Sequence, residues 1–324
     1  MRSRIVNIRA AAKQALEEGP CRVVAGYAPG TMAMRARPIF IDKPEDAGKL
    51  TWSSFCVGNL AGLLTQAAHA APGKIGVVAQ GCVSRNLVGL IGEGRFKRED
   101  LYIIGVPCLG MAERRKIEAK YPGRAIIAVE EAEDVFVVRG KRREVRMLRR
   151  DVLRDNCYTC VQRNPVIFDV LVADSAPDAE PSTGGGDIDK VAAPWERLAP
   201  EARLTAFEAA YKDCIRCYAC RDVCPLCYCA TCFVDESQPQ WLGKTQDFAD
   251  IANYHLLRAL HCAGRCTDCG ACESACPQNI KVRRLTSKLE KDVRALYGHQ
   301  AGMALGEAPP LTVYKPDDPQ DFIK

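Results

Sequence analysis

Two runs of cysteines in the second half of the sequence have the spacing of iron–sulfur ligands. Each run reads C-x2-C-x2-C-x3-C and is followed by proline, as in bacterial ferredoxins. The first run comprises Cys214, Cys217, Cys220 and Cys224, and the second comprises Cys266, Cys269, Cys272 and Cys276. In ferredoxins with two clusters, the fourth cysteine of each run ligates the cluster held by the other run.

This rule predicts two interlocked [4Fe–4S] clusters. The ligands of cluster one are Cys214, Cys217, Cys220 and Cys276, and those of cluster two are Cys266, Cys269, Cys272 and Cys224. Structural zinc sites also use closely spaced cysteine pairs, but two complete runs, both with the proline, favour iron–sulfur clusters. The crossing makes the two clusters neighbours, which suits the transfer of electrons from one to the other.

Four cysteines in the first half of the sequence form a third candidate group. Cys82 and Cys108 each follow an apolar run that predicts a strand, and Cys157 and Cys160 form an N-C-x2-C pair. Because loops at the carboxyl ends of neighbouring parallel strands lie side by side, the first two cysteines can converge with the pair. We predict a third [4Fe–4S] cluster here. A zinc site and buried structural cysteines are the alternatives.

Six cysteines remain outside these three groups. A fourth metal-binding group would consist of Cys227, Cys229, Cys232 and Cys262. Its C-x-C-x2-C spacing differs from the ferredoxin run, so local packing or a redox-exposed thiol is the alternative. Cys21 and Cys56 have no partner at ligand spacing, and we expect them to be small buried hydrophobic residues.

Composition argues against disulfide bonds as the role of the 18 cysteines. Disulfide frameworks belong to small secreted domains, whereas this chain has 324 residues, of which 48% are hydrophobic. No apolar run approaches the roughly 18 residues of a membrane helix, and the charged start lacks the apolar region of a secretory signal. We therefore expect a cytoplasmic protein without a transmembrane segment. The net charge of +5 is too small to imply a nucleic-acid partner.

Predicted strands and helices alternate through the first part of the chain. Apolar residues at helical spacing predict helices over residues 4–18, 52–70 and 84–94, and β-branched runs predict strands over 21–30, 74–81 and 101–106. This alternation indicates an α/β domain with a mostly parallel sheet. Residues 125–140 add further strand material. The basic stretch Arg139–Arg154 is expected to form a solvated helix face, with contact to an acidic partner or a phosphate-bearing cofactor as the alternative.

Changes in composition predict the domain organisation. Two helical stretches, over residues 196–213 and 247–261, run directly into the cysteine runs and indicate an α-helical, ferredoxin-like domain with two [4Fe–4S] clusters. A segment rich in Gly, Pro, Ser and Asp precedes it. The predicted parts are an α/β domain at 1–171, a linker or exposed insert at 172–194, the ferredoxin-like domain at 195–295 and an extended tail at 296–324.

Motifs for other chemistry are missing from the sequence. No GxGxxG follows a predicted strand, and there is no Walker loop or catalytic triad. The scattered histidines, which we expect to be structural, are His69, His255, His261 and His299. We therefore assign no catalytic residue.

The cysteine-bearing segments resemble the iron–sulfur beta-subunit family of the deazaflavin-coenzyme-reducing hydrogenases and formate dehydrogenases of anaerobes. The resemblance rests on AQGCVSRNLVGLIGEGRFKREDLYIIGVPCLG, on NCYTC and on the paired runs, and covers roughly residues 75–165 and 210–285. It is greatest to relatives that carry a C-terminal ferredoxin domain and occur with heterodisulfide-reductase-like complexes. The resemblance implies a cluster on Cys82, Cys108, Cys157 and Cys160. Some family members also bind a flavin, but no residue here matches a flavin site.

Three functions follow from these observations. The first is an iron–sulfur electron-transfer subunit of an anaerobic multi-subunit oxidoreductase. Such a subunit relays electrons between a catalytic subunit, such as formate dehydrogenase or hydrogenase, and a flavin- and cluster-bearing module of heterodisulfide-reductase type. The second is a flavin-containing catalytic subunit that reduces a deazaflavin or nicotinamide coenzyme. The third is a cluster-bearing scaffold or redox sensor.

Overall fold

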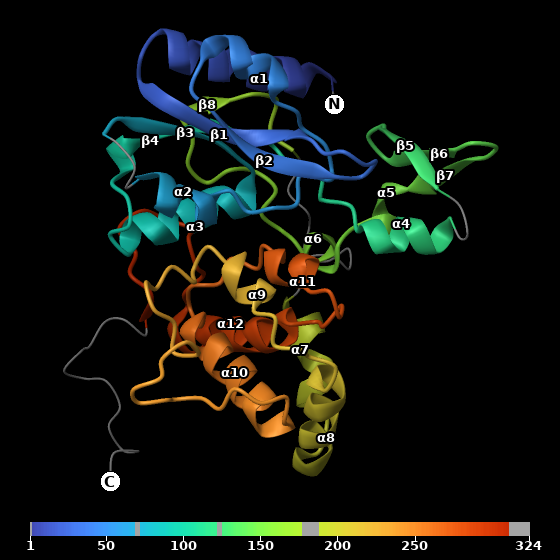
Figure 1. The fold of residues 1–324 in the computed structure, drawn as a ribbon, viewed down its shortest axis with the longest axis vertical. Coiled ribbons are helices and arrows are strands. Elements are labelled where there is room, and N and C mark those ends of the chain that lie inside the picture. Colours follow the sequence, from blue (N-terminus) through green and yellow to red (C-terminus); the bar gives the residue numbers. More distant parts are fainter. Residues whose placement is uncertain (1, 69–71, 122–124, 177–187, 311–324) are drawn as a thin grey trace.

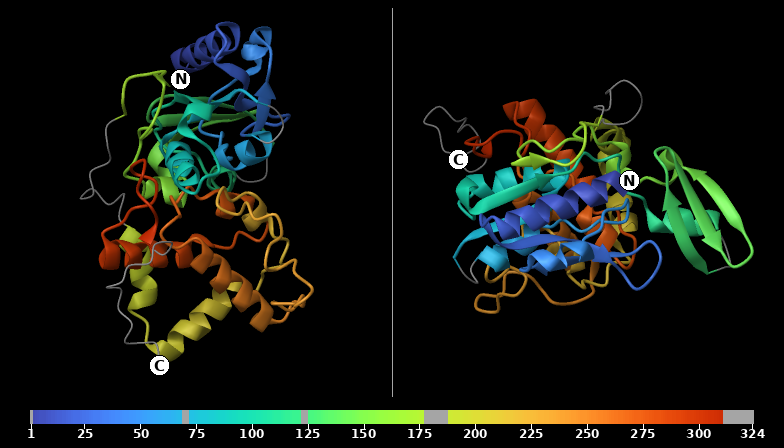
Figure 2. Two further views of the ribbon diagram at one scale, coloured as in Figure 1. Left: turned by 90° about the vertical axis from the view of Figure 1, so that its left-hand side faces the viewer. Right: turned by 90° about the horizontal axis from the view of Figure 1, so that it is seen from above.

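The computed structural model describes residues 2–68, 72–121, 125–176 and 188–310 of the chain. An α/β part lies at one end of the molecule, and a helical part with most of the cysteines lies at the other (Figure 1; Figure 2, left). No helix in the described ranges is long and apolar enough to cross a membrane.

A five-stranded sheet forms the centre of the α/β part, in the order β2-β1-β3-β4-β8. Strand β2 (Ala36–Ile41) pairs antiparallel with β1 at one edge. The parallel strands are β1 (Cys21–Pro29), β3 (Lys74–Ala79), β4 (Leu101–Gly105) and β8 (Val170–Leu171). The mostly parallel sheet predicted from the sequence is thus confirmed.

Helices cover both faces of this sheet (Figure 1). Helix α1 (Arg2–Glu17) lies on one face and buries Ile8, Ala11, Ala12 and Ala15, which share one side of the helix. Helices α2 (Ala61–Ala68) and α3 (Gly81–Gly92) lie on the other face. Two short 3-10 helices lie in the connections between these elements: η1 (Pro44–Lys49) between β2 and α2, and η2 (Arg98–Asp100) between α3 and β4. Cys21 and Cys56 are buried in the core of this part, as expected.

The helix predicted over residues 52–70 is wrong for its first half. The described helix α2 begins at Ala61, and residues 69–71 lie outside the described ranges. Asn59 Oδ1 accepts a hydrogen bond from the Ala61 N–H at 3.1 Å, so its side chain competes with helical hydrogen bonding just after Gly58. The apolar residues before it are buried in an irregular segment, which periodicity alone does not distinguish from a helix face.

A second, three-stranded antiparallel sheet projects from the side of the first (Figure 2, right). It consists of β5 (Ile126–Glu131), β6 (Val135–Gly140) and β7 (Glu144–Leu148), and it packs with α4 (Arg114–Lys120) and α5 (Arg149–Val152). Phe136 and Ile117 are fully buried in its own small core. The sequence predicted the strand material but not a separate sheet.

The solvated helix expected for Arg139–Arg154 is also wrong. The stretch contains the end of β6, strand β7 and the short helix α5, and two of its arginines are buried. The Arg149 side chain donates from Nε to Glu133 O at 2.6 Å and from Nη1 to Ser54 Oγ at 2.6 Å. Arg154 is buried at the boundary with the helical part. Two arginines of this run therefore supply internal hydrogen-bond donors, whereas Arg142, Arg143, Arg146 and Arg150 are exposed.

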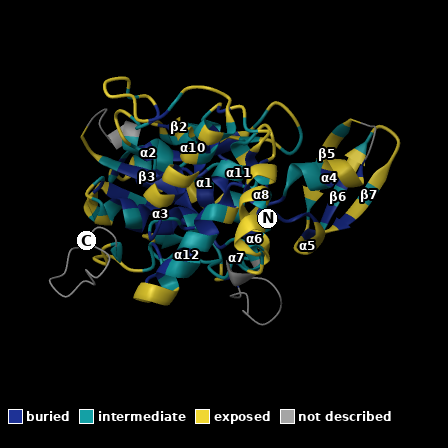
Figure 3. Ribbon diagram, turned by 90° about the horizontal axis from the view of Figure 1, so that it is seen from below, coloured by how far each residue is buried: buried dark blue, intermediate teal, exposed yellow. Residues whose placement is uncertain are grey.

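Helices dominate the second half of the chain. The described helices there are α7 (Ile188–Glu196), α8 (Pro200–Tyr211), α9 (Ala219–Asp222), α10 (Phe248–His261), α11 (Ala271–Ala275) and α12 (Arg283–Tyr297). The two helical stretches predicted before the cysteine runs correspond to α8 and α10. Strand β3 is buried throughout its centre, whereas α8 buries little besides Phe207 and Tyr211 (Figure 3).

Two predicted segments fall partly outside the described residues. Residues 177–187 of the predicted linker and residues 311–324 of the predicted tail are not described. Helix α7 spans the predicted boundary between linker and helical domain. His299 and Ala301, in the described part of the tail, are buried against the rest of the molecule.

Buried polar contacts join the two parts of the molecule. Arg85 of α3 donates from Nη2 to Ala301 O at 2.7 Å and from Nη1 to Thr267 O at 3.4 Å. Asn156, on the short helix α6 (Asp155–Tyr158), donates from Nδ2 to Cys269 O at 3.0 Å. The positive φ of Gly270, +67°, and its missing Cβ allow this approach, because a Cβ would lie 2.4 Å from Asn156 Oδ1.

We expect Arg85→Met to destabilise the protein, because it leaves two buried carbonyl groups without their donor. Each unpaired buried acceptor costs about 1–3 kcal/mol, which corresponds to a fall of roughly 5 °C in the midpoint of thermal unfolding. Arg142→Met, at an exposed position of the second sheet, is the matched control. Equal midpoints for the two variants, measured by circular dichroism under anaerobic conditions, would contradict this role of Arg85.

Candidate metal centres

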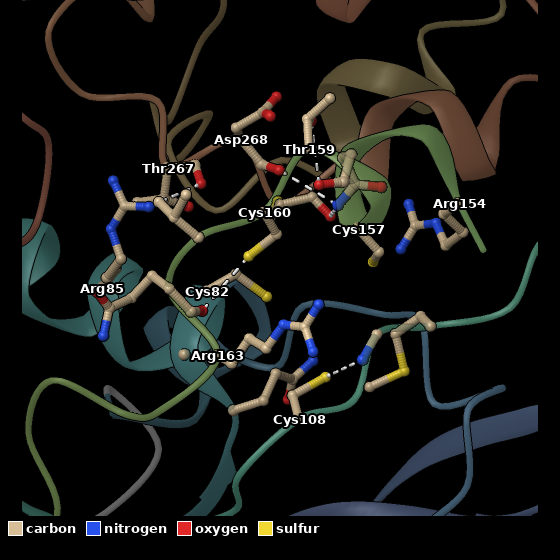
Figure 4. A pocket seen from close by; sticks show the side chains of 18 of the residues that line it. Cys82, Arg85, Cys108, Arg154, Cys157, Thr159, Cys160, Arg163, Thr267 and Asp268 are labelled. Carbon is tan, nitrogen blue, oxygen red and sulfur yellow. Dashed lines mark hydrogen bonds between the residues drawn. The ribbon is translucent and has the colours of Figure 1, made fainter. Parts of the chain in front are cut away.

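One cavity brings together four cysteines from three separate segments of the α/β part. This Cys82 cavity is lined by Cys82, Cys108, Cys157 and Cys160 (Figure 4). Cys82 lies in the first turn of α3, which follows β3, and Cys108 follows β4. Strands β3 and β4 are parallel neighbours, so their carboxyl ends place Cys82 and Cys108 at one edge of the sheet. Cys157, on α6, and Cys160, just after it, line the same cavity.

Several basic side chains line the Cys82 cavity together with its cysteines. Its wall includes the arginines Arg85, Arg154, Arg163 and Arg294. The Gly110 N–H donates to Cys108 Sγ at 3.3 Å. Burial raises the pKa of the Cys108 thiol to about 12 and that of Cys160 to about 11. An isolated thiolate is therefore unfavourable in this cavity, and a bound cationic metal core would supply the missing positive charge.

A second cavity, the Cys214 cavity, is lined by Cys214, Cys217, Cys220 and Cys276. Two main-chain N–H groups and two polar side-chain atoms lie within hydrogen-bonding distance of these sulfurs. The main-chain N–H groups of Arg216 and Ile280 donate to Cys214 Sγ at 3.4 Å and to Cys276 Sγ at 3.3 Å. The Tyr254 hydroxyl lies 3.2 Å from Cys220 Sγ, and His255 Nε2 lies 3.3 Å from Cys214 Sγ. Such hydrogen bonds stabilise thiolates and raise the reduction potential of a bound cluster.

A third cavity, the Cys266 cavity, is lined by Cys224, Cys262, Cys266, Cys269 and Cys272. The fourth cysteine of each run thus lies with the first three cysteines of the other run. Burial raises the pKa of the Cys272 thiol to about 12. Asp268 lies between the first two cysteines of the second run. Its carboxylate accepts hydrogen bonds from the buried Arg283 of α12, and this contact fixes the loop.

The loops of the two runs share one backbone conformation. Arg216 and Tyr218 have φ angles of 50° and 59°, and the equivalent positions, Asp268 and Gly270, have φ angles of 57° and 67°. Three of these four residues are not glycine, so the loops adopt the left-handed region at a cost of roughly 1–2 kcal/mol per residue. This repeated strain turns successive cysteines of each run toward one cavity.

Two short helices connect the Cys214 and Cys266 cavities. Helix α9 carries Cys220 and leads to Cys224, while α11 carries Cys272 and leads to Cys276. Each helix therefore has one cysteine at each cavity. The Cys82 and Cys266 cavities are also adjacent, because Thr267, Asp268 and Cys269 line both of them. The three cavities form a continuous series through the molecule.

Arg258 places a buried positive charge within this series. Its side chain, on α10, is 4% exposed and donates from Nη2 to Cys220 O at 3.0 Å. Burial alone lowers the pKa of Arg258, but the sulfurs of Cys272 and Cys224 raise it overall, so the guanidinium stays charged. It stabilises negative charge on the neighbouring sulfurs.

A fourth cavity, the Cys227 cavity, lies beside the other two in the helical part and is more open to solvent. It is lined by Cys227, Cys229, Cys232 and Cys262 together with Tyr254 and several arginines. Cys229 is exposed, whereas Cys262 is 3% exposed and also lines the Cys266 cavity. In the described ranges, no group of three or more His, Cys, Asp or Glu side chains is arranged to bind a single metal ion.

The donor sets of these cavities fit iron–sulfur clusters. Four cysteines surround each of the Cys82 and Cys214 cavities, and the Cys266 cavity has four cysteines of the predicted group plus Cys262. Thiolate donors, main-chain N–H groups at the sulfurs and buried arginines are the features that stabilise an anionic cluster. Such a cluster supplies one-electron redox chemistry when it is bound.

Sequence reasoning missed several residues at these cavities. His255 was expected to be structural, yet it lies against Cys214, and burial lowers its pKa to about 3. Tyr254 and Arg258 were not singled out at all. The sequence did contain one signal for these residues. They lie on α10, which leads directly into the second cysteine run, so one face of this helix is expected to line the cavities.

Comparisons with known proteins agree with the resemblance seen in the cysteine motifs. No protein-family profile matches the chain. The F420-dependent formate dehydrogenase subunit beta of Methanocaldococcus jannaschii is 24% identical over 326 aligned positions, which cover 85% of this chain and 85% of that protein. The F420-dependent formate dehydrogenase 1 subunit beta of Methanococcus maripaludis is 24% identical and covers 92% of this chain and 90% of that protein.

A solved structure, the F420-reducing [NiFe] hydrogenase complex of Methanosarcina barkeri, matches half of this chain and 59% of that chain. Its sequence identity is 14% and its TM-score is 0.36, which is too low to support an argument about the fold. The two sequence relatives span most of this chain at similar identity. The predicted resemblance to beta subunits of deazaflavin-dependent formate dehydrogenases is thereby confirmed, and the chain is similar to these subunits over most of its length.

Proposed function

We propose that this chain is an iron–sulfur electron-transfer subunit of a multi-subunit oxidoreductase. Three [4Fe–4S] clusters are bound, in this proposal, by the cysteines of the Cys82, Cys214 and Cys266 cavities. The observation that carries the proposal is the continuous series of these cavities, in which neighbours share wall residues or short helices. Electrons then pass through the chain without a diffusing carrier.

The proposed ligands follow the predicted groups. The ligands of cluster one are Cys214, Cys217, Cys220 and Cys276, those of cluster two are Cys266, Cys269, Cys272 and Cys224, and those of cluster three are Cys82, Cys108, Cys157 and Cys160. Clusters one and two lie in the helical part, which we propose to be a ferredoxin-like domain over residues 195–295. Cluster three lies in the α/β domain, residues 1–171.

The order of the clusters follows from the shared walls. Cys269 lines both the Cys266 and Cys82 cavities, so cluster two lies between clusters one and three. Cys217, at the Cys214 cavity, is exposed to solvent, so cluster one is the end that a partner can reach from the surface of the helical part.

The partners are proposed from the relatives and the motif resemblance. Two relatives are beta subunits of formate dehydrogenases, which supports a formate dehydrogenase or hydrogenase catalytic subunit at one end of the relay. A flavin- and cluster-bearing module of heterodisulfide-reductase type is proposed at the other end. The many reduced thiols fit a cytoplasmic location.

The test uses the complex isolated anaerobically through an affinity tag on this chain. With formate or hydrogen as the donor, we expect reduction of the iron–sulfur centres, seen by EPR, followed by reduction of the flavin in the partner module. Cys82→Ala should lose about four irons per chain and stop reduction of that flavin, while dithionite still reduces the remaining clusters. Cys56→Ala, buried outside all four cavities, is the control.

Two results would exclude the relay. Near-stoichiometric flavin on the isolated chain, with direct reduction of a deazaflavin or nicotinamide, would establish the catalytic alternative. Centres that neither formate nor hydrogen reduces in the intact complex would favour a scaffold or sensor. Unchanged iron content in Cys82→Ala would exclude cluster three.

The crossing of ligands gives a separate prediction. Cys276→Ala should remove cluster one and Cys224→Ala should remove cluster two, each with a loss of about four irons per chain. The Tyr254 hydroxyl lies 3.2 Å from Cys220 Sγ, and Tyr254 lines neither the Cys82 cavity nor the Cys266 cavity. Tyr254→Phe should therefore shift the EPR signal that Cys276→Ala abolishes and leave the signals of clusters two and three unchanged. Loss of that signal in Cys224→Ala instead would show that each run supplies all four ligands of its own cluster.

Removal of the buried charge at Arg258 should lower the reduction potential of cluster two. The reduced cluster carries one more negative charge, so Arg258→Gln disfavours reduction by about 60 mV, which is about 1.4 kcal/mol for one electron. Arg258→Lys keeps the charge and serves as the matched control. Potentiometric titration followed by EPR measures the shift, and equal potentials in both variants would contradict the electrostatic role.

A further inference from the structure

Four cysteines remain that the proposed three-cluster relay does not use, and three of them lie on one loop. Cys227, Cys229 and Cys232 follow α9, and Cys262 ends α10. All four line the Cys227 cavity, which has a volume of about 580 Å³. Segments at least thirty residues apart in the sequence thus bring four thiol donors to one space.

The loop that carries the three cysteines is fixed at both ends. At its start, the Tyr228 hydroxyl donates to Glu93 Oε2 at 2.6 Å, and Arg265 Nη2 donates to the same carboxylate at 2.7 Å. At its end, Cys232 O accepts the Asp235 N–H at 2.8 Å. The cysteine positions are therefore held before any metal binds, which is a requirement of a preformed metal site.

The surroundings are cationic and adjoin the proposed cluster two. Arg221, Arg258 and Arg265 line the cavity, and the Arg258 side chain is buried. Cys262 lines both this cavity and the Cys266 cavity, whose wall also contains Cys224. Positive charge next to four thiolates is the environment that an anionic cluster requires.

We propose that Cys227, Cys229, Cys232 and Cys262 bind a fourth [4Fe–4S] cluster, which branches from cluster two toward the surface. Cys229 is exposed, so this cluster exchanges electrons with a partner at the surface. Cys262 lines both the Cys227 and Cys266 cavities, which gives a direct path between the two clusters. The chain then has a second surface exit for electrons.

The test counts metals in the full-length chain, expressed and purified anaerobically. We expect about 16 irons in the wild type, and about 12 in Cys229→Ser and in Cys232→Ser, with loss of one EPR signal after reduction. These two cysteines line only the Cys227 cavity, so their loss leaves the other three ligand sets intact. Cys21→Ser, buried in the core of the α/β part, should keep about 16 irons.

Two outcomes overturn the proposal. One is a wild type with about 12 irons that both variants retain, which leaves the three-cluster relay standing. The other is about one zinc per chain that disappears in both variants, which makes the site a zinc site. Non-denaturing mass spectrometry of the wild type counts the clusters without any substitution, so a variant that fails to fold does not affect the result.

Discussion

The structure depends on how the chain offsets the unfavourable burial of negatively charged thiolates in its interior. Cysteines form much of the centre of the helical part, where Cys214, Cys220, Cys272 and Cys276 pack with Tyr211, Tyr254 and Ile251. Burial raises the pKa of the thiols of Cys214, Cys220 and Cys272, because a thiolate loses its hydration there. In the proposed function, a metal core that replaces the thiol protons would make this unfavourable interior stable. Metal binding and folding of this half would then be coupled.

Buried arginines serve the same electrostatic need and also hold the molecule together. Arg85, Arg154 and Arg258 each donate hydrogen bonds to main-chain carbonyls while they line a cysteine cavity. Two of these bonds join the α/β part to the helical part. A guanidinium has several donors in a fixed plane and remains charged when buried, so one side chain can fix the backbone and offset negative charge together.

The parallel sheet explains why the third group of cysteines lies where it does. In parallel strands the carboxyl ends share one edge, and the loops after β3 and β4 bring Cys82 and Cys108 to it. The second cysteine run contacts the same edge through Thr267, Asp268 and Cys269. The fold thus places ligands from the sheet next to ligands from the helices, which makes a series of redox centres within one chain physically reasonable.

The sequence by itself determined the local features. The ligand spacing of Cys214–Cys224 and Cys266–Cys276, the alternation of strands and helices, and the burial of Cys21 and Cys56 all follow from short-range pattern and residue type. The sequence pattern wrongly predicted a helix at residues 52–60, because buried apolar residues in an irregular segment resemble a helix face. It also wrongly predicted a solvated position for Arg149, whose side chain donates to Glu133 O and Ser54 Oγ.

Only the tertiary structure decided how the predicted cysteine groups lie relative to one another. Cys269 lines the Cys82 and Cys266 cavities, Cys262 lines the Cys227 and Cys266 cavities, and His255, Tyr254 and Arg258 contact the cysteine loops from a separate helix. These relations arise from packing between distant segments, and the hydrogen-bond acceptors of Arg85, Arg154 and Arg258 are backbone atoms, which every residue has. Sequence spacing therefore specifies each ligand loop, whereas the order of the centres depends on how the loops pack against one another.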